Sequence, residues 1–180
     1  MSREFPDYVD PWKAADGRRA FQGTMPIRRM QRLLPMLEAT EDIKALEAAF
    51  SIRFGHDQQG LVVLNVYAEA HLPLLCQRSM KPYMEPVQRK SRLSVVTELA
   101  EAELLPEHYD PVMVEDGRMA LLDVVEDELI LGVPQVPRNP EVDAVELSTD
   151  GKVELPPVEE EPTQRPFAGL AGMLKAQDPD

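Results

Sequence analysis

The chain has 180 residues and a formal net charge of −13, and 43% of its residues are hydrophobic, which is enough to build a core. Its 17 prolines and 9 glycines argue against a bundle of long helices, and no apolar run approaches the roughly 20 residues that a membrane helix requires. The single cysteine excludes a disulfide framework, and the N-terminus lacks the basic start and apolar centre of a signal peptide. We therefore expect a soluble cytoplasmic protein with one domain of ordinary size and a tail.

The charge is distributed unevenly along the chain. Residues 1–100 carry 14 Lys and Arg against 12 Asp and Glu, whereas residues 101–180 carry 5 against 20. Binding to nucleic acid depends on a local basic surface rather than on the sum of all charges. The acidic total therefore does not exclude a nucleic-acid partner, although it argues against binding polyanions over the whole surface.

The first predicted elements are short. A helical turn is predicted over 11–15, with Asp10 as its N-cap and proline at its first position, and a short strand is predicted over 18–23. Residues 26–34 are predicted to form a short helix that Pro35 ends or kinks. On that helix we expect three basic side chains to cluster: Arg28, Arg29 and Arg32.

Three segments with alternating apolar residues predict the centre of the fold. Residues 61–76 place an apolar side chain at every second position, which is typical of a strand with one buried face. Cys76 lies in register with that face, so we interpret it as a packing residue rather than a reactive thiol. Strands over 43–54 and 83–97 are expected to flank this segment through short turns. The predicted fold is α+β, an antiparallel meander sheet that can curl toward a partly open barrel and is covered by short helices.

The part of the chain after the sheet is predicted to be mostly helical and then acidic. A helical turn with a loop is predicted over 97–111, and the strongest helix of the sequence over 120–134. The expected organisation is a core domain over 1–137, an acidic flexible segment over 138–165 and a short C-terminal element over 166–180.

The helix predicted over 120–134 carries four acids whose role is open at this point: Asp123, Glu126, Asp127 and Glu128. The favoured interpretation is a solvated helix face; the alternatives are an acidic patch that binds a basic partner and, last, a divalent-cation or acid–base site that uses Asp123 and Asp127. The sequence has no spacing typical of a catalytic motif or a metal site. We therefore expect no enzyme activity, metal, cofactor or small-molecule substrate.

Basic residues provide the candidate binding surface. Arg78 and Lys81 lie in the turn after residue 76, where side chains are free to meet a partner. With the other basic residues of this half they could form a surface that contacts phosphates: Arg28, Arg29, Arg32, Arg78, Lys81, Arg89, Lys90 and Arg92. Ordinary solvated faces with scattered arginines are the alternative.

Short motifs along nearly the whole chain resemble the YceD family of bacterial large ribosomal RNA subunit accumulation proteins. The resemblance is most distinctive in the block VEDELIL at 125–131 and includes LCQR at 75–78. The other matching pieces are Gln22-Gly23, Pro82, Leu122-Asp123, Pro134, Val136-Pro137, Pro166-Phe167-Ala168, Leu170-Ala171 and Leu174-Lys175. The family usually has a second cysteine three residues after the first, where this chain has Ser79, and this departure removes a two-cysteine metal or redox site.

The resemblance implies a non-enzymatic factor that supports normal levels of large-subunit ribosomal RNA. Its expected partner is pre-ribosomal large-subunit RNA or a large-subunit ribosomal protein, with no membrane involved. The alternative is a protein-interaction adaptor whose acidic helix and tail bind a basic partner protein. The resemblance assigns no defined role to any single residue.

Overall fold

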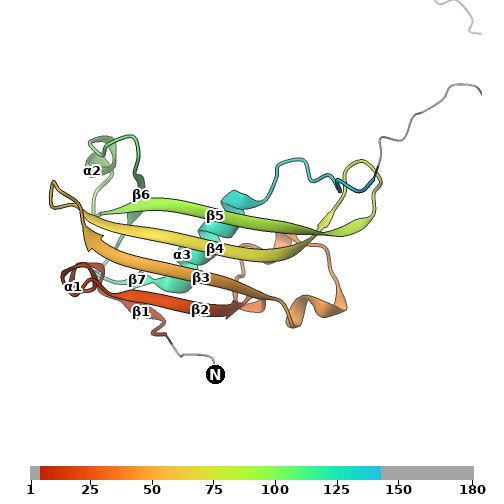
Figure 1. Cartoon of the computed structure of the whole chain (residues 1–180), viewed down its shortest axis with the longest axis horizontal. Coiled ribbons are helices and arrows are strands. Elements are labelled where there is room, and N and C mark those ends of the chain that lie inside the picture. Colours follow the sequence, from red (N-terminus) through yellow and green to blue (C-terminus); the bar gives the residue numbers. More distant parts are fainter. Residues whose placement is uncertain (1–4, 143–180) are drawn as a thin grey trace, which may run out of the picture. The chain divides into compact units, whose positions relative to one another are not determined.

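The structure of the chain, a computed structural model, describes residues 5–142 (Figure 1). Most of the predicted acidic segment and all of the predicted C-terminal element therefore lie outside the described residues. The strands are β1 (Tyr8–Val9), β2 (Ala20–Pro26), β3 (Glu47–His56), β4 (Val62–Leu75), β5 (Pro82–Val96), β6 (Asp110–Met113) and β7 (Met119–Ala120). The α-helices are α1 (Pro11–Asp16), α2 (Leu99–Glu103) and α3 (Leu121–Gly132), and short 3-10 turns span Ile27–Arg29, Leu34–Met36 and Glu41–Lys44.

Five strands form the main sheet in the order β2-β3-β4-β5-β6. The strands β3, β4 and β5 pair antiparallel with their neighbours in the chain, which confirms the predicted three-stranded meander. β2 pairs antiparallel with β3 and adds a strand that the prediction did not place in this sheet. β6 pairs with β5 in the parallel direction, a pairing that no local pattern in the sequence predicts. The sheet is open, because β2 and β6 form its two edges. β1 and β7 form a separate two-stranded sheet next to the start of α3.

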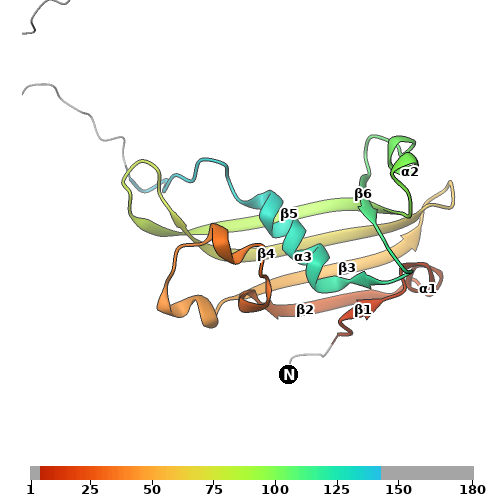
Figure 2. The ribbon, with the colours of Figure 1, turned by 180° about the vertical axis from the view of Figure 1, so that it is seen from behind.

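Helix α3 covers one face of the main sheet. It passes behind the strands in Figure 1 and in front of them in Figure 2. Its Leu121, Val125 and Leu129 are fully buried in one cluster with alternate residues of the strands, among them Ile52 and Leu64. The strongest alternation in the sequence, that of β4, therefore reflects burial against a helix on one side and exposure on the other.

The segment predicted as a helix over 26–34 is not an α-helix. It consists of a 3-10 turn at Ile27–Arg29 and further turns, and Pro35 lies inside the next 3-10 turn. Its apolar residues Ile27, Met30 and Leu33 are all fully buried, so the segment packs beside the sheet as a series of turns rather than as an amphipathic helix. We call residues 26–34 the plug. Pro35 has no N–H to donate and disfavours helical geometry at the residue before it, so it limits the length of any helix in this segment.

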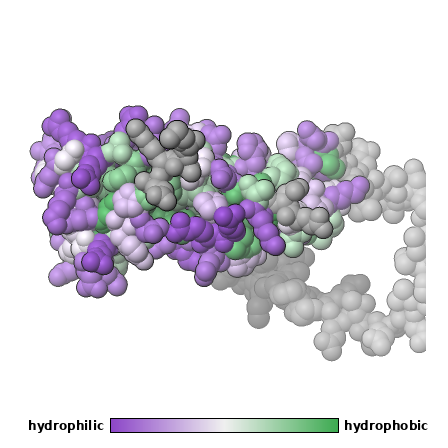
Figure 3. All heavy atoms as spheres, turned by 90° about the horizontal axis from the view of Figure 1, so that it is seen from below, coloured by the Kyte–Doolittle hydropathy of each residue, from purple (hydrophilic) through white to green (hydrophobic). Residues whose placement is uncertain are grey.

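The predicted boundaries of the other elements are correct to within a few residues. α1 has Asp10 as its N-cap, with the side-chain oxygen accepting a hydrogen bond of 3.1 Å from the Lys13 N–H. β3 begins at Glu47 rather than at residue 43, because residues 41–44 form a 3-10 turn. On the side seen from below, hydrophobic areas are interspersed with hydrophilic ones (Figure 3).

Gly132 allows the last turn of α3 to approach β5 closely. A Cβ atom added at this position would lie 2.5 Å from Val87 Cγ1 and 3.0 Å from Arg89 Cγ. Both distances are shorter than ordinary van der Waals contacts, so the absence of a side chain determines how near the helix lies to the strand.

Candidate nucleic-acid interface

The eight basic residues predicted as a binding surface do not form one patch. Arg28, Arg29 and Arg32 belong to the segment before β3, and Arg78 and Lys81 to the turn between β4 and β5. Arg89, Lys90 and Arg92 lie on β5, where consecutive side chains point to opposite faces.

Arg32 is held by the acidic residues of α3. Its Nε and Nη2 lie 3.2 and 3.1 Å from Glu126 Oε2, and its Nη1 lies 2.6 Å from Asp127 Oδ1. Glu126 also accepts hydrogen bonds from the backbone N–H groups of Arg32 and Leu33, at 2.6 and 3.0 Å. Glu126 is 3% exposed, so the interpretation of this side chain as part of a solvated helix face is wrong. The Glu126 side chain links the plug to α3.

Arg89 has the same relation to Glu128. Its Nε lies 3.3 Å from Glu128 Oε2, and Glu128 is 3% exposed. The solvated-face interpretation is therefore wrong for Glu128 as well. A buried carboxylate is tolerated when a cation neutralises it. Here the carboxylate comes from α3, and the cation comes from the face of β5 that packs against α3. Asp123 and Asp127 remain exposed on the helix. A partner-binding role of these four acids stays a prediction.

Three of the four remaining cations outside β5 contact groups of this chain. Arg28 Nη1 donates a 3.0 Å hydrogen bond to the Lys44 carbonyl, and Arg29 forms a 2.8 Å ion pair with Asp7. Arg78 Nη1 donates to the carbonyl of Val142 at 2.6 Å, and Lys81 is exposed in the turn. A role of these residues in binding stays a prediction.

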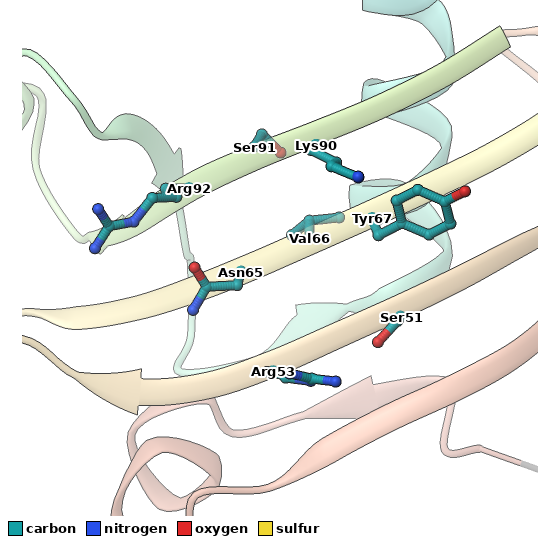
Figure 4. Close-up of a pocket in the computed structure, with 8 residues that line it drawn as sticks. All are labelled: Ser51, Arg53, Asn65, Val66, Tyr67, Lys90, Ser91 and Arg92. Carbon is teal, nitrogen blue, oxygen red and sulfur yellow. The ribbon is translucent and has the colours of Figure 1, made fainter.

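Lys90 and Arg92 lie on the face of the sheet opposite α3, which we call the outer face. Two cross-strand rows lie there: Arg53 pairs with Asn65 and Asn65 with Arg92, and one step along, Ser51 pairs with Tyr67 and Tyr67 with Lys90. These six residues, with Val66 and Ser91 between them, line a shallow hollow (Figure 4). We call the six residues Ser51, Arg53, Asn65, Tyr67, Lys90 and Arg92 the outer-face site.

Two aromatic rings lie beside the cations of this face. The Lys90 ammonium is 5.6 Å from the centroid of the Tyr67 ring, and Figure 4 shows it reaching toward that ring. The Arg92 guanidinium is 5.0 Å from the centroid of Tyr109, and its Nη2 donates to the Tyr109 hydroxyl at 3.2 Å. Arg92 also lines a neighbouring hollow with His56 and His108, so the two hollows meet at this side chain.

The Tyr67 hydroxyl is fixed by a polar pair at one edge of the outer-face site. It donates to Glu69 and accepts a 2.7 Å hydrogen bond from Gln88 Nε2. The hydrogen bond from Tyr67 lowers the pKa of Glu69, and the same bond raises the pKa of Tyr67. Glu69 is therefore a carboxylate and Tyr67 a neutral phenol at neutral pH.

Four members of the outer-face site, Ser51, Arg53, Asn65 and Tyr67, are not among the binding residues that the sequence predicts. The polar positions of β3 and β4 alternate with apolar ones, and this alternation is visible in the sequence. The alternation alone does not reveal the site, because the pairing of residues across neighbouring strands depends on the register between those strands.

Cys76 is fully buried, which confirms its predicted position on the packed face. Its Sγ accepts a 3.3 Å hydrogen bond from the Asn139 N–H, and Gln77 N–H donates to the Pro137 carbonyl at 2.9 Å.

In residues 5–142 no three His, Cys, Asp or Glu side chains are grouped so that they could hold a metal ion. Among the described helices, none has the length and apolar character needed to cross a membrane.

Comparison with known proteins gives a consistent result. A family model described as "Large ribosomal RNA subunit accumulation protein YceD" matches residues 64–174. A protein of that name from Haemophilus influenzae is 31% identical over 172 residues, which cover 94% of this chain and 96% of the relative. No solved structure matches the chain.

Proposed function

This chain belongs to the YceD family, and on that premise we propose that it supports accumulation of large-subunit ribosomal RNA by binding precursor RNA through the outer-face site. The proposed role is that of a non-catalytic factor in the bacterial cytoplasm. It needs no cofactor, because the protein's contribution is to hold RNA rather than to change it.

The observation that carries this proposal is the set of unpaired cations on the outer face. In the described part of the chain, Arg53, Lys90 and Arg92 form no ion pair with a carboxylate. Their charges are thus available to phosphates, whereas the charges of Arg32 and Arg89 are already neutralised by α3. Asn65 and Ser51 add neutral hydrogen-bonding groups between the cations.

The adaptor alternative has weaker support within residues 5–142. It relies on the acids of α3, and two of the four, Glu126 and Glu128, are buried and bound to this chain's own arginines. Asp127 is exposed but already paired with Arg32 at 2.6 Å, so of the four acids only Asp123 could meet a basic partner without breaking a contact of the helix. The acids after residue 142 lie outside the described residues.

The test of the proposed function replaces Arg53, Lys90 and Arg92 together by glutamine in a strain that produces no wild-type protein. We expect the triple variant to lose its cross-linking to large-subunit precursor RNA and to lower the level of large-subunit ribosomal RNA. A control for the loss of one cation elsewhere is Arg118→Gln, which removes an exposed cation from the turn between β6 and β7. Unchanged cross-linking of the triple variant would refute binding through the outer face.

A further inference from the structure

We infer that the RNA held on the outer face is an unpaired segment, one of whose bases stacks on the ring of Tyr67. This inference rests on the proposed function and specifies the class of RNA. It follows from the position of the ring, from what lies on it and from the way it is fixed.

Tyr67 occupies the centre of the outer-face site. It lies on β4, the middle strand of the five, and its neighbours across the sheet are Ser51 on β3 and Lys90 on β5. The ring is half-buried, with small or flexible neighbours on each side. A planar ligand can therefore reach the ring from the solvent side without displacing the backbone.

The ring is fixed before any ligand arrives. The hydroxyl bonds with Glu69 and Gln88 prevent the ring from turning away from its place on the sheet. A pre-positioned aromatic ring loses little conformational freedom when a base stacks on it. This distinguishes Tyr67 from an exposed tyrosine that is free to rotate.

The Lys90 side chain lies over the face of the Tyr67 ring on which a base would stack. Its ammonium is 5.6 Å from the ring centroid, and nothing else among the described side chains holds it by an ion pair. An exposed cation–π contact is weaker than the stacking of a base on an aromatic ring. A base can thus replace the ammonium, and the released ammonium lies where it can contact the phosphate of the same nucleotide.

A second stacking position lies next to the first. The Arg92 guanidinium is held over the buried ring of Tyr109, and the exposed ring of His108 lies 4.1 Å from Tyr109, centroid to centroid. Guanidinium planes and histidine rings both stack on unpaired bases. Because Arg92 lines both hollows, a strand that leaves Tyr67 can continue to this second position.

These features select against a double helix. The bases of a duplex are stacked on each other, and their faces are closed to a protein ring. A duplex could use only the cations of the outer face, whereas an unpaired segment uses the cations and the rings together.

The test measures binding of the full-length protein to two RNA probes, an unstructured strand of about ten nucleotides and a perfectly paired duplex of the same length. We expect wild-type protein to prefer the single strand. Tyr67→Leu should weaken single-strand binding about tenfold without changing duplex binding or the salt dependence, and Tyr67→Phe should retain most of the affinity. Thiouridine cross-linking of the single strand should modify the peptide that contains Tyr67.

The outcomes separate this inference from the proposed function. If the Arg53, Lys90 and Arg92 triple variant loses RNA while Tyr67→Leu binds like wild type, or if the duplex binds as tightly as the single strand, the inference is wrong and the proposed function stands. If wild-type protein binds neither probe and captures only a basic protein, both are wrong. Circular dichroism and the unfolding midpoint of each variant confirm that it is folded.

Discussion

Arg89 and Lys90 are consecutive residues whose side chains have opposite surroundings. Arg89 lies 3.3 Å from the buried carboxylate of Glu128 on the helix side of β5, whereas Lys90 lies over the ring of Tyr67 on the outer face. One residue thus belongs to the packing of α3, and its neighbour to the outer-face site. The pleat of a single strand separates the two roles.

This pair provides a matched test within one strand. Lys90→Gln should weaken RNA binding and reduce the slope of log affinity against log salt by about 0.7, with little change in stability. Arg89→Gln should leave the salt slope unchanged and lower the free energy of unfolding by about 1–3 kcal/mol, because it leaves Glu128 buried without a cation. RNA titrations at several salt concentrations and urea unfolding provide the measurements. Equal effects of the two variants on binding would show that the faces are not functionally distinct.

Glu69 should oppose RNA binding at every pH from about 5 to 8. The hydrogen bond from Tyr67 holds the pKa of Glu69 below its ordinary value, so the carboxylate remains ionised throughout this range. Glu69→Gln removes the charge and keeps an acceptor for the Tyr67 hydroxyl, and we expect it to bind RNA about 2- to 5-fold more tightly at low salt.

The pH dependence of that gain tests its cause. Since Glu69 does not titrate between about pH 5 and 8, the ratio of the two affinities should be constant there, and it should fall only below the lowered pKa, where wild type also loses the charge. A ratio that falls as the pH is lowered from 8 to 6 would contradict the assigned ionisation of Glu69. Fluorescence anisotropy of a labelled RNA at each pH measures the ratio.

Glu126 should be one of the most sensitive polar positions for stability. Glu126→Ala leaves the backbone N–H groups of Arg32 and Leu33 without their acceptor and removes one of the two carboxylates that hold the Arg32 guanidinium, and we expect the free energy of unfolding to fall by about 3 kcal/mol. Asp123→Ala changes an exposed acid on the same helix and should cost less than about 1 kcal/mol. Urea unfolding at pH 7 compares them, and similar midpoints would mean that the contact between the plug and α3 is not stabilising.

Gly132→Ala should destabilise the protein although alanine favours helices. Alanine gains about 1 kcal/mol over glycine in a helix interior, but its Cβ would lie 2.5 Å from Val87 Cγ1, and overpacking of this kind costs about 1–3 kcal/mol. Leu131→Ala, at a neighbouring position that is 65% exposed, should change stability much less. Thermal unfolding is the measurement, and a Gly132→Ala protein with a higher midpoint would show that α3 can move away from β5 without loss.

The sequence predicted the elements that depend on local periodicity. β4 and β5 could be predicted because apolar residues recur at every second position. α1 could be predicted because Asp10 is a favourable N-cap residue and Pro11 is favourable at the first helical position. The helix predicted over 26–34 is wrong, because the apolar spacing of Ile27, Met30 and Leu33 is compatible with a helix and equally with buried turns. Pro35 limits how far a helix could extend in this segment.

The candidate site was harder to predict, because its members are far apart in the chain. Glu126 and Arg32 are 94 residues apart, and Glu128 and Arg89 are 39 apart, so no local pattern could show that these acids are buried by pairing. Lys90 and Arg92 were correctly placed on one face of their strand. Only the cross-strand register joins them to Tyr67 and Arg53.

The short parallel pairing of β6 has a consequence for solubility. Within residues 5–142, β6 covers β5 only from Leu93 to Val96, so most of the fifteen-residue strand β5 is an open edge of the sheet. Open edges can recruit strands from other molecules. Pro86, which has no N–H to donate, and the charged residues near it make this edge a poor template for another chain. The proline and the charged residues of β5 thus protect this edge against pairing with a strand of another molecule.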